Sequence, residues 1–169
     1  PIATGSWVLV GDMSLRGDLA ATGGSDVVGF QQAGTGAVPR TAQDKHRDIV
    51  HSKDFGAVGS GDETTQIQNA LNAAVGKILL LDGTKTYTVT SVSIPDNVTL
   101  RTGGAVFRRE SGSGYIVTVG ANVTADIISV SDIGGASNVG VHIAGSNTTI
   151  GRILAKSDDL ASLFGVRIE

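Results

Sequence analysis

Three tripeptides carry the main signal in this chain: Asn97-Val98-Thr99, Asn122-Val123-Thr124 and Asn147-Thr148-Thr149. Each begins 25 residues after the previous one. The same spacing separates Gly140-Val141-His142-Ile143 from Gly165-Val166-Arg167-Ile168. Because two unrelated motifs share one register, the second half of the chain is a structural repeat.

A repeat of this length, rich in Val, Ile, Thr and Gly, predicts the coils of a parallel β-solenoid in a mainly β fold. Stacked coils shield each other's apolar side chains, and each fully buried Ile or Val contributes roughly 1.5–3 kcal/mol of transfer free energy. Stability therefore depends on neighbouring coils. The predicted interior columns are Leu100 with Ala125 and Ile150, Val117 with Ile143 and Ile168, and Ile128 with Ile153.

The repeated asparagines predict corners, because Asn tolerates left-handed backbone conformations and forms local hydrogen bonds. The same tripeptides also match the pattern of N-glycosylation sites, but the regular spacing favours the corner interpretation. His142 and Arg167 lie between inward-pointing neighbours, so strand alternation predicts that both point outward.

Composition limits the classes of function. The 169 residues include 40% hydrophobic residues and 24 glycines, as expected of a folded, loop-rich β protein. A net charge of −3 and the absence of a long basic run argue against nucleic acid as a partner. No apolar stretch approaches 18 residues, so no membrane insertion is expected. Without cysteine there are no disulfides, and the start without Met suggests a fragment of a longer polypeptide.

The first third of the chain divides into an apolar N-terminal tail (1–13) and a helical neck or particle-attachment region (14–53). Ser14 is expected to cap a short helix. Thr41 is expected to begin a second helix, with Asp44 completing a capping box and with Ile49-Val50 near its end. A short strand is expected at 27–30. The residues predicted to pack against a partner or against other copies are Trp7, Val8, Leu15, Leu19 and Phe30.

A third helix begins the last region (54–169). Asp62 is its predicted cap, Gly76 its stop, and Ile67, Leu71 and Ala74 lie on one face. We expect this helix to cover the exposed edge of the first coil, with further coils stacked beyond it.

Metal and cofactor binding find little support in the sequence. His46 and His51 are five residues apart, whereas ligands on one helix face are three or four apart, so no metal site is predicted. No cofactor is predicted either.

The stretch Ser52–Gly59, followed by Asp62–Gln68, resembles the opening of the pectate-lyase-like superfamily of right-handed parallel β-helices. Gly59-Ser60-Gly61 stands where that family usually has Gly-Asp-Gly. The resemblance implies the fold more than the function. Its motif residues in this chain are Asp54, Phe55, Gly56, Gly59, Gly61, Asp62, Thr64, Ile67 and Gln68.

Three upstream stretches, 15–20, 24–30 and 34–45, are similar to the segment that precedes the β-helix in bacteriophage tailspike proteins. This resemblance implies a homotrimer on the virion tail that acts outside the cell. It further implies phage tail or baseplate proteins as partners, together with a β-helix that recognises bacterial surface polysaccharide. Many members of the family degrade that polysaccharide.

Catalysis is not predicted within this segment. Glycoside hydrolysis uses two carboxylates that flank one bond. Asp132 and Asp158 are the candidates, although they are one position out of register and fit better as solvated turn residues. Asp54 and Asp62 are expected to cap backbone amides. The alternatives are part of a cellular carbohydrate-active β-helix enzyme, either a polysaccharide lyase or a glycoside hydrolase, or a β-solenoid adhesin.

Overall fold

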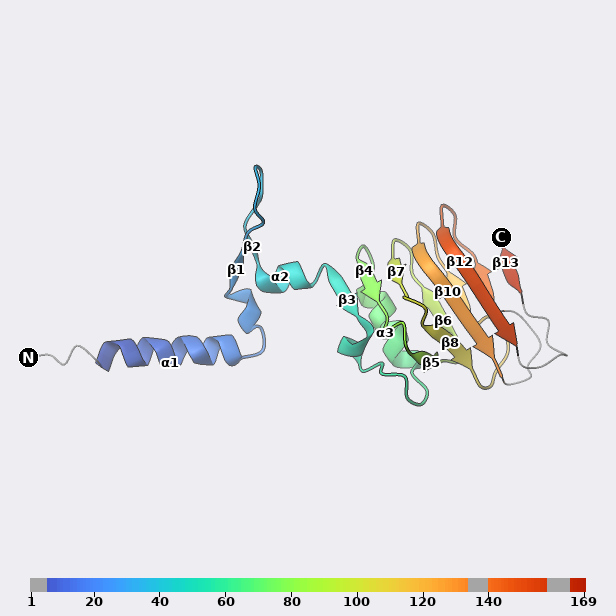
Figure 1. Cartoon of the computed structure of the whole chain (residues 1–169), viewed down its shortest axis with the longest axis horizontal. Helices are drawn as coiled ribbons and strands as arrows, with labels where there is room; N and C mark the ends of the chain where they lie inside the picture. The colour runs from blue at the N-terminus through green and yellow to red at the C-terminus, as the bar shows by residue number, and fades with distance from the viewer. Residues whose placement is uncertain (1–5, 134–139, 158–164) are drawn as a thin grey trace, which may run out of the picture. The chain divides into compact units, whose positions relative to one another are not determined.

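The computed structural model describes residues 6–133, 140–157 and 165–169, with side chains from residue 13 onward apart from residue 157. The chain is mainly β, with parallel sheets and few helices (Figure 1). It divides into two compact units, Pro1–Asp48 and Ile49–Glu169.

The first unit contains helix α1 (Ser6–Ala20), the 3-10 turn η1 (Gly24–Asp26), strands β1 (Gly29–Phe30) and β2 (Arg40–Thr41), which pair antiparallel, and helix α2 (Ala42–His46). The cap of α2 is confirmed, because the Thr41 hydroxyl accepts a hydrogen bond of 3.1 Å from the Asp44 amide.

Two helix predictions in this unit are wrong. Ser14 lies inside α1 and does not cap it. The helix continues through Gly11, because one glycine in a helix interior lowers helix stability by only about 1 kcal/mol relative to alanine. Helix α2 stops at His46, and Ile49–His51 forms strand β3, because these residues pair with the first coil of the second unit.

Arg40 joins strand β2 to helix α2 and the residues after it. Its Nε donates to Asp44 Oδ2 at 2.6 Å, while Nη1 and Nη2 donate to the two carboxylate oxygens of Asp48 at 2.9 and 2.8 Å. These hydrogen bonds hold the pKa values of both carboxyl groups below their ordinary value. The Arg40 guanidinium therefore holds α2 and Asp48, the last residue of the first unit, against strand β2.

The second unit is a stack of coils whose strands form two parallel sheets. The larger sheet contains β3, β4 (Ile78–Leu80), β5 (Thr86–Thr88), β7 (Thr99–Arg101), β8 (Val106–Arg109), β10 (Thr124–Asp132) and β12 (Thr149–Ser157). The smaller sheet contains β6 (Val92–Ile94), β9 (Val117–Val119), β11 (Val141–Ile143) and β13 (Val166–Ile168).

The register of the stack confirms two of the three predicted columns. Ala125 pairs with Leu100 below it and Ile150 above it, and Ile128 pairs with Ile153. Leu100 and Ile128 are fully buried. These ladders form the core between the two sheets.

The third predicted column is confirmed for Ile143 and Ile168, which pair with each other, but its Val117 member is wrong, because Val117 pairs with Val141 and Ile143 pairs with Val119. The coil that starts at Asn97 reaches its second-sheet strand one residue later than the coil that starts at Asn122. The sequence comparison aligned Gly114 with Gly140, and it therefore placed β9 two residues away from its true register with β11.

The asparagine corners are confirmed. Asn97, Asn122 and Asn147 have φ angles of 63°, 54° and 55°, in the left-handed region. Their side chains also form a ladder: Asn122 Nδ2 donates to Asn97 Oδ1 at 3.2 Å, and Asn147 Nδ2 donates to Asn122 Oδ1 at 2.9 Å. The repeated residue therefore serves both the turn and the contact between coils.

The lower edge of the first coil is covered, as predicted, by helix α3 (Thr64–Ala73) and the residues before it. The Gln68 amide pairs with Ser93 as a neighbouring strand would, with Nε2 donating to the Ser93 carbonyl and Oε1 accepting from the Ser93 amide, both at 2.8 Å. The Thr64 hydroxyl accepts from the Thr90 amide at 2.8 Å. Ile67, Ala70 and Leu71 on α3 are fully buried.

Replacing Gln68 with Glu should weaken this cover. The Ser93 carbonyl would lose its donor and face a carboxylate, and we expect unfolding free energy to fall by about 1–3 kcal/mol. Urea unfolding at neutral pH measures the change. Asn69→Asp is the matched control, because Asn69 is exposed on the same helix. Equal losses in the two variants would mean that added charge, and not the bond to Ser93, is responsible.

Candidate functional site

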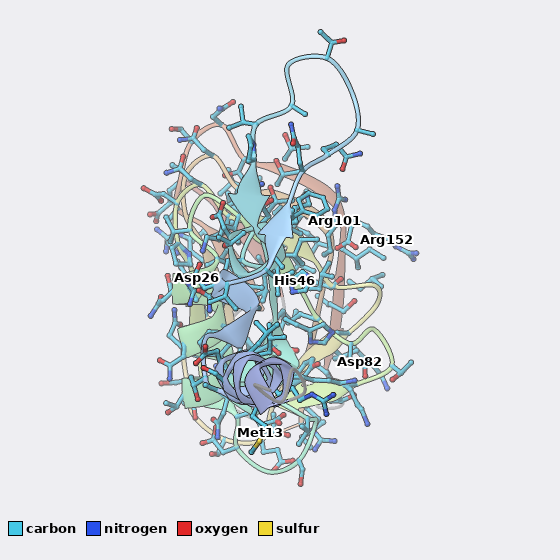
Figure 2. All side chains as sticks on the ribbon, turned by 90° about the vertical axis from the view of Figure 1, so that its left-hand side faces the viewer. Met13, Asp26, His46, Asp82, Arg101 and Arg152 are labelled. Atoms are coloured by element: carbon cyan, nitrogen blue, oxygen red, sulfur yellow. The ribbon has the colours of Figure 1, made fainter. Side chains whose placement is uncertain are left out.

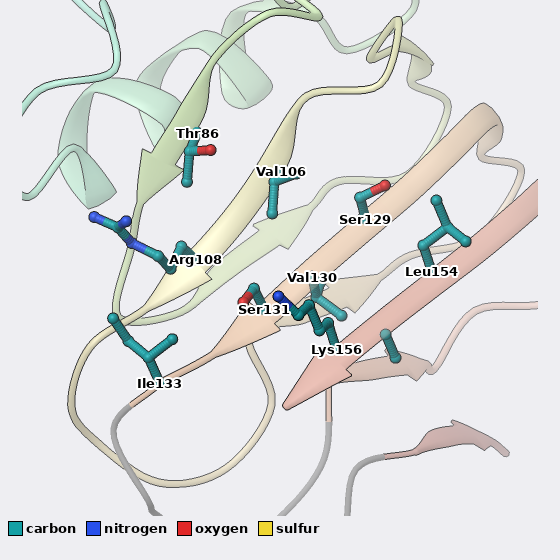
Figure 3. Close-up of a pocket in the computed structure, with 10 residues that line it drawn as sticks. Thr86, Val106, Arg108, Ser129, Val130, Ser131, Ile133, Leu154 and Lys156 are labelled. Carbon is teal, nitrogen blue, oxygen red and sulfur yellow. The ribbon is translucent and has the colours of Figure 1, made fainter. Parts of the chain in front are cut away.

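The outer face of the larger sheet carries a groove of about 660 Å³ (Figure 3). Four successive coils contribute to it through strands β5, β8, β10 and β12. Its lining residues are Thr86, Val106, Arg108, Ser129, Val130, Ser131, Ile133, Leu154, Ala155 and Lys156.

The register explains how these side chains come together. Successive residues of a strand point to opposite faces. Phe107 and Val130 therefore point into the core, where each is 1% exposed, and their neighbours point outward. Parallel pairing then stacks the outward residues into two columns, Thr86 with Val106, Ser129 and Leu154, and Arg108 with Ser131 and Lys156.

The groove contains two basic side chains. Arg108 and Lys156 line it, and among the described residues that line it none is acidic. Arg108 Nη2 donates to Glu110 Oε1 at 2.7 Å and to the Thr88 hydroxyl at 3.2 Å, and the side chain is 38% exposed. These two bonds hold the guanidinium at one end of the groove. An arrangement of fixed cation, hydroxyls and apolar side chains suits recognition of a polar, anionic ligand.

Asp132 does not lie on a solvated turn or in an open catalytic site, and both predictions for it are wrong. Strands β8 and β10 pair it with Arg109, so both side chains point into the interior. Arg109 Nη2 donates to Asp132 Oδ2 at 2.6 Å, with the side chains 0% and 2% exposed. Arg109 Nη1 also donates to the Gly114 carbonyl at 2.6 Å. Asp158, the other candidate, lies outside the described residues.

Asp126, the other acidic residue of β10, also serves the contact between coils. Burial acts to raise the pKa of its carboxyl group, but the backbone amides of Thr102, Ile127 and Gly103 donate to it and together hold the pKa below its ordinary value. Its carboxylate is therefore engaged in holding the turn after β7.

The family motif proves to be structural. Asp62 Oδ1 accepts from the Thr64 amide at 2.9 Å, which confirms that it binds a backbone amide, but the N-cap residue of α3 is Glu63 and not Asp62 as predicted. The prediction for Asp54 is wrong, since Asp54 is exposed and, within the described part of the chain, no amide donates to its carboxylate. Gly56, Gly59 and Gly61 all have positive φ angles.

Glu63 was missed. It is 2% exposed, and its carboxylate accepts from the amides of Val58 and Gly59 at 2.6 and 2.8 Å. The adjacent acids Asp62-Glu63 were the available signal, because the resemblance expects an acidic pair there.

The neck residues have different surroundings. Leu15 and Leu19 on α1 are 54% and 45% exposed, and Phe30 is half-buried on β1. Trp7 and Val8 belong to α1, but their side chains lie outside the described residues.

His142 was predicted to be a plain surface residue, but it belongs to a small cluster on the smaller sheet. Its ring stacks on Tyr115 with centroids 4.3 Å apart, and its side chain is only 13% exposed. Arg167, aligned with it and exposed as predicted, donates from Nη1 to the Tyr115 hydroxyl at 3.2 Å. The cluster joins residues from three coils.

The described residues carry neither a metal-ligand cluster nor a membrane-spanning helix. Among them, no group of three or more His, Cys, Asp or Glu side chains could hold a metal ion. His51 Nδ1 accepts from the Lys53 amide at 3.2 Å and so has a local structural role. No helix found in these ranges has both the length and the apolar character needed to cross a membrane.

The Arg109–Asp132 pair gives a direct test of its structural role. Arg109→Met would leave the Asp132 carboxylate buried without its partner, and we expect the free energy of unfolding to fall by about 3–5 kcal/mol. The double variant Arg109→Met/Asp132→Leu should recover most of that loss, because it removes both charges. Urea unfolding of the wild type, both single variants and the double variant measures the coupling. Additive losses would show that the two side chains do not act as a pair.

The known proteins that are similar to this chain in sequence, as described below, are phage proteins. No protein-family model matches the chain. It is 34% identical over 122 residues to the capsule K30/K69-specific depolymerase 1 of Klebsiella phage K5-2, covering 69% of this chain and 14% of that protein. The capsule K30/K69-specific depolymerase of Klebsiella phage K64-1 is 33% identical over 120 residues, covering 67% and 14%. The tail spike protein of an Escherichia phage is 42% identical over 74 residues, covering 43% and 9%.

Among solved structures, the tailspike protein of E. coli bacteriophage HK620, determined in complex with a pentasaccharide, matches with a TM-score of 0.57. The match covers 92% of this chain and 39% of that one, and at 13% identity it supports the fold alone. The chain spans 14% of the length of the Klebsiella phage relatives. Sequence and fold agree: the chain is a homologue of bacteriophage tail spike proteins and capsule depolymerases.

Proposed function

We propose that this chain is the N-terminal part of a homotrimeric phage tail spike, a component of the virion tail that acts outside the cell. In this proposal, the neck attaches the spike to tail or baseplate proteins. The coils begin a right-handed parallel β-helix that recognises bacterial surface polysaccharide. The observation that carries the proposal is the 34% identity, over 69% of the chain, to a phage depolymerase named for its capsule specificity.

The exposed apolar side chains of helix α1 support self-association. Met13 is 71% exposed, Leu15 54% and Leu19 45%, and Met13 projects away from the helix (Figure 2). Apolar side chains grouped on one short helix are typical of a contact surface. We assign this surface to the other two copies of the chain, packed around a threefold axis.

Polysaccharide degradation is proposed for the full-length protein and not for these coils. The carboxylates of Asp126 and Asp132 are engaged in hydrogen bonds between coils, so neither is free to protonate a glycosidic oxygen. A glycosidase or lyase site would therefore use other carboxylates. The relatives named above are all phage proteins, which favours a spike over a cellular enzyme or an adhesin.

Light scattering of the 169-residue chain tests the trimer. We expect the mass of three chains for the wild type, and a shift toward one chain for Leu15→Ser/Leu19→Ser, because the variant places hydroxyls on the contact surface. Val38→Ser is the matched control, since Val38 is 72% exposed in the same unit but lies outside α1. A wild-type chain that stays monomeric at high concentration would contradict the proposal.

A further inference from the structure

We infer that one segment of the neck, the arm formed by residues 27–39, inserts into an uncharged, apolar pocket on the tail protein that receives the spike. This inference rests on the proposed function and names the surface that makes the attachment. The arm comprises strand β1 and the residues that lead from it to β2. Charged residues make up 17% of the chain, yet the arm has none, while Asp26 and Arg40 flank it.

The arm also carries exposed apolar side chains. Val27 is 62% exposed, Val28 42% and Val38 72%. Apolar side chains grouped on a surface are typical of a contact site, and charged residues are depleted at the centres of protein interfaces. The composition of the arm therefore indicates a protein partner. Its pocket is itself expected to be uncharged, because a charge buried there would meet no counter-charge on the arm.

The shape of the arm is fixed before a partner binds. Strands β1 and β2 pair at its base, and beyond them Gln31 Nε2 donates to the Ala37 carbonyl at 3.1 Å. The Ala37 amide in turn donates to the Gly34 carbonyl at 3.4 Å. Arg40, held by its two carboxylates, follows the arm directly. A loop that is already ordered loses less conformational freedom on binding, so its apolar side chains contribute more to affinity.

The base of the arm is anchored to both helices of the first unit. Gly24 is buried, and a Cβ atom at this position would meet the Leu19 carbonyl of α1, so only glycine allows the close approach. The Val28 carbonyl accepts from the Ala42 amide of α2 at 2.8 Å. In Figure 1 the hairpin of β1 and β2 stands out to the side of α1. The arm is therefore a fixed lateral projection.

The arm and α1 provide two separate contacts. The proposed function assigns Met13, Leu15 and Leu19 of α1 to the other copies of the chain. Because the arm leaves α1 sideways, neighbours packed along that helix leave the valines of the arm uncovered. Three such arms around the axis would face the surrounding tail protein. A second copy is therefore the less suitable occupant, and the solution mass of arm variants separates the two cases.

The test uses the full-length spike and phage particles assembled without their own spike. Spike is mixed with these particles at increasing concentration, the particles are pelleted, and the bound spike is measured. We expect Val27→Ser/Val38→Ser to weaken binding by about tenfold or more, because it removes methyl groups from the buried centre of the contact. Val58→Ser/Val75→Ser is the matched control, since these valines are 51% and 48% exposed but lie in the second unit. It should bind within about twofold of wild type.

A charge placed on the arm tests the uncharged pocket. Thr35→Asp adds a carboxylate at an exposed position of the arm and should also weaken binding by about tenfold or more. Asn69→Asp, on the exposed face of α3, should bind within about twofold of wild type. Raising the ionic strength about tenfold should change wild-type binding by less than about twofold, because no charges pair across the contact. Thermal unfolding and light scattering check that each variant is folded and keeps the mass of three chains.

Three outcomes would overturn the inference while leaving the proposed function intact. They are wild-type affinity for either arm variant, an equal loss of affinity in the control of the same type, and arm variants that no longer have the mass of three chains. The last outcome would assign the arm to a neighbouring copy. Failure of the wild-type spike to bind the particles would instead contradict the proposed function itself.

Discussion

A stack of parallel coils leaves a row of unpaired backbone amides and carbonyls at its first coil, and the rest of this structure depends on how that row is covered. Strand β3 pairs with β4, while Thr64 and Gln68 supply side-chain hydrogen bonds to Thr90 and Ser93. The family motif therefore supplies the hydrogen bonds that cover the open edge of the first coil.

Above this cover, the contacts between coils repeat with the sequence. The asparagine side chains form a ladder at one corner, and the apolar columns fill the interior. The ion pair between Arg109 and Asp132 joins two coils inside the stack, where replacing both with apolar residues would cost little but removing one would cost much. Because the interior is closed, any ligand must be met by the outward-facing side chains, and the groove at Arg108 and Lys156 is such a place.

Local patterns and partners one 25-residue repeat apart were predictable from the sequence, and partners at other separations were not. The period of the asparagines gave the coils, and the spacing of Ile67 and Leu71 gave the covering helix. The column containing Val117 failed because the length of a loop, which no periodic pattern records, sets its register. The burial of Asp132 could not be foreseen, since it depends on an arginine 23 residues earlier being turned inward by the pairing of β8 with β10. Predicting the groove likewise requires knowledge of which residues share a face on four strands.

We propose that this chain forms the attached base of a phage spike. Cryo-electron microscopy of the full-length protein on its virion would test it most directly. We expect three copies around one axis, with residues 1–48 against the tail and the coils from residue 49 leading outward. A single copy, or a spike whose coils lie against the tail while residues 1–48 point away, would contradict it.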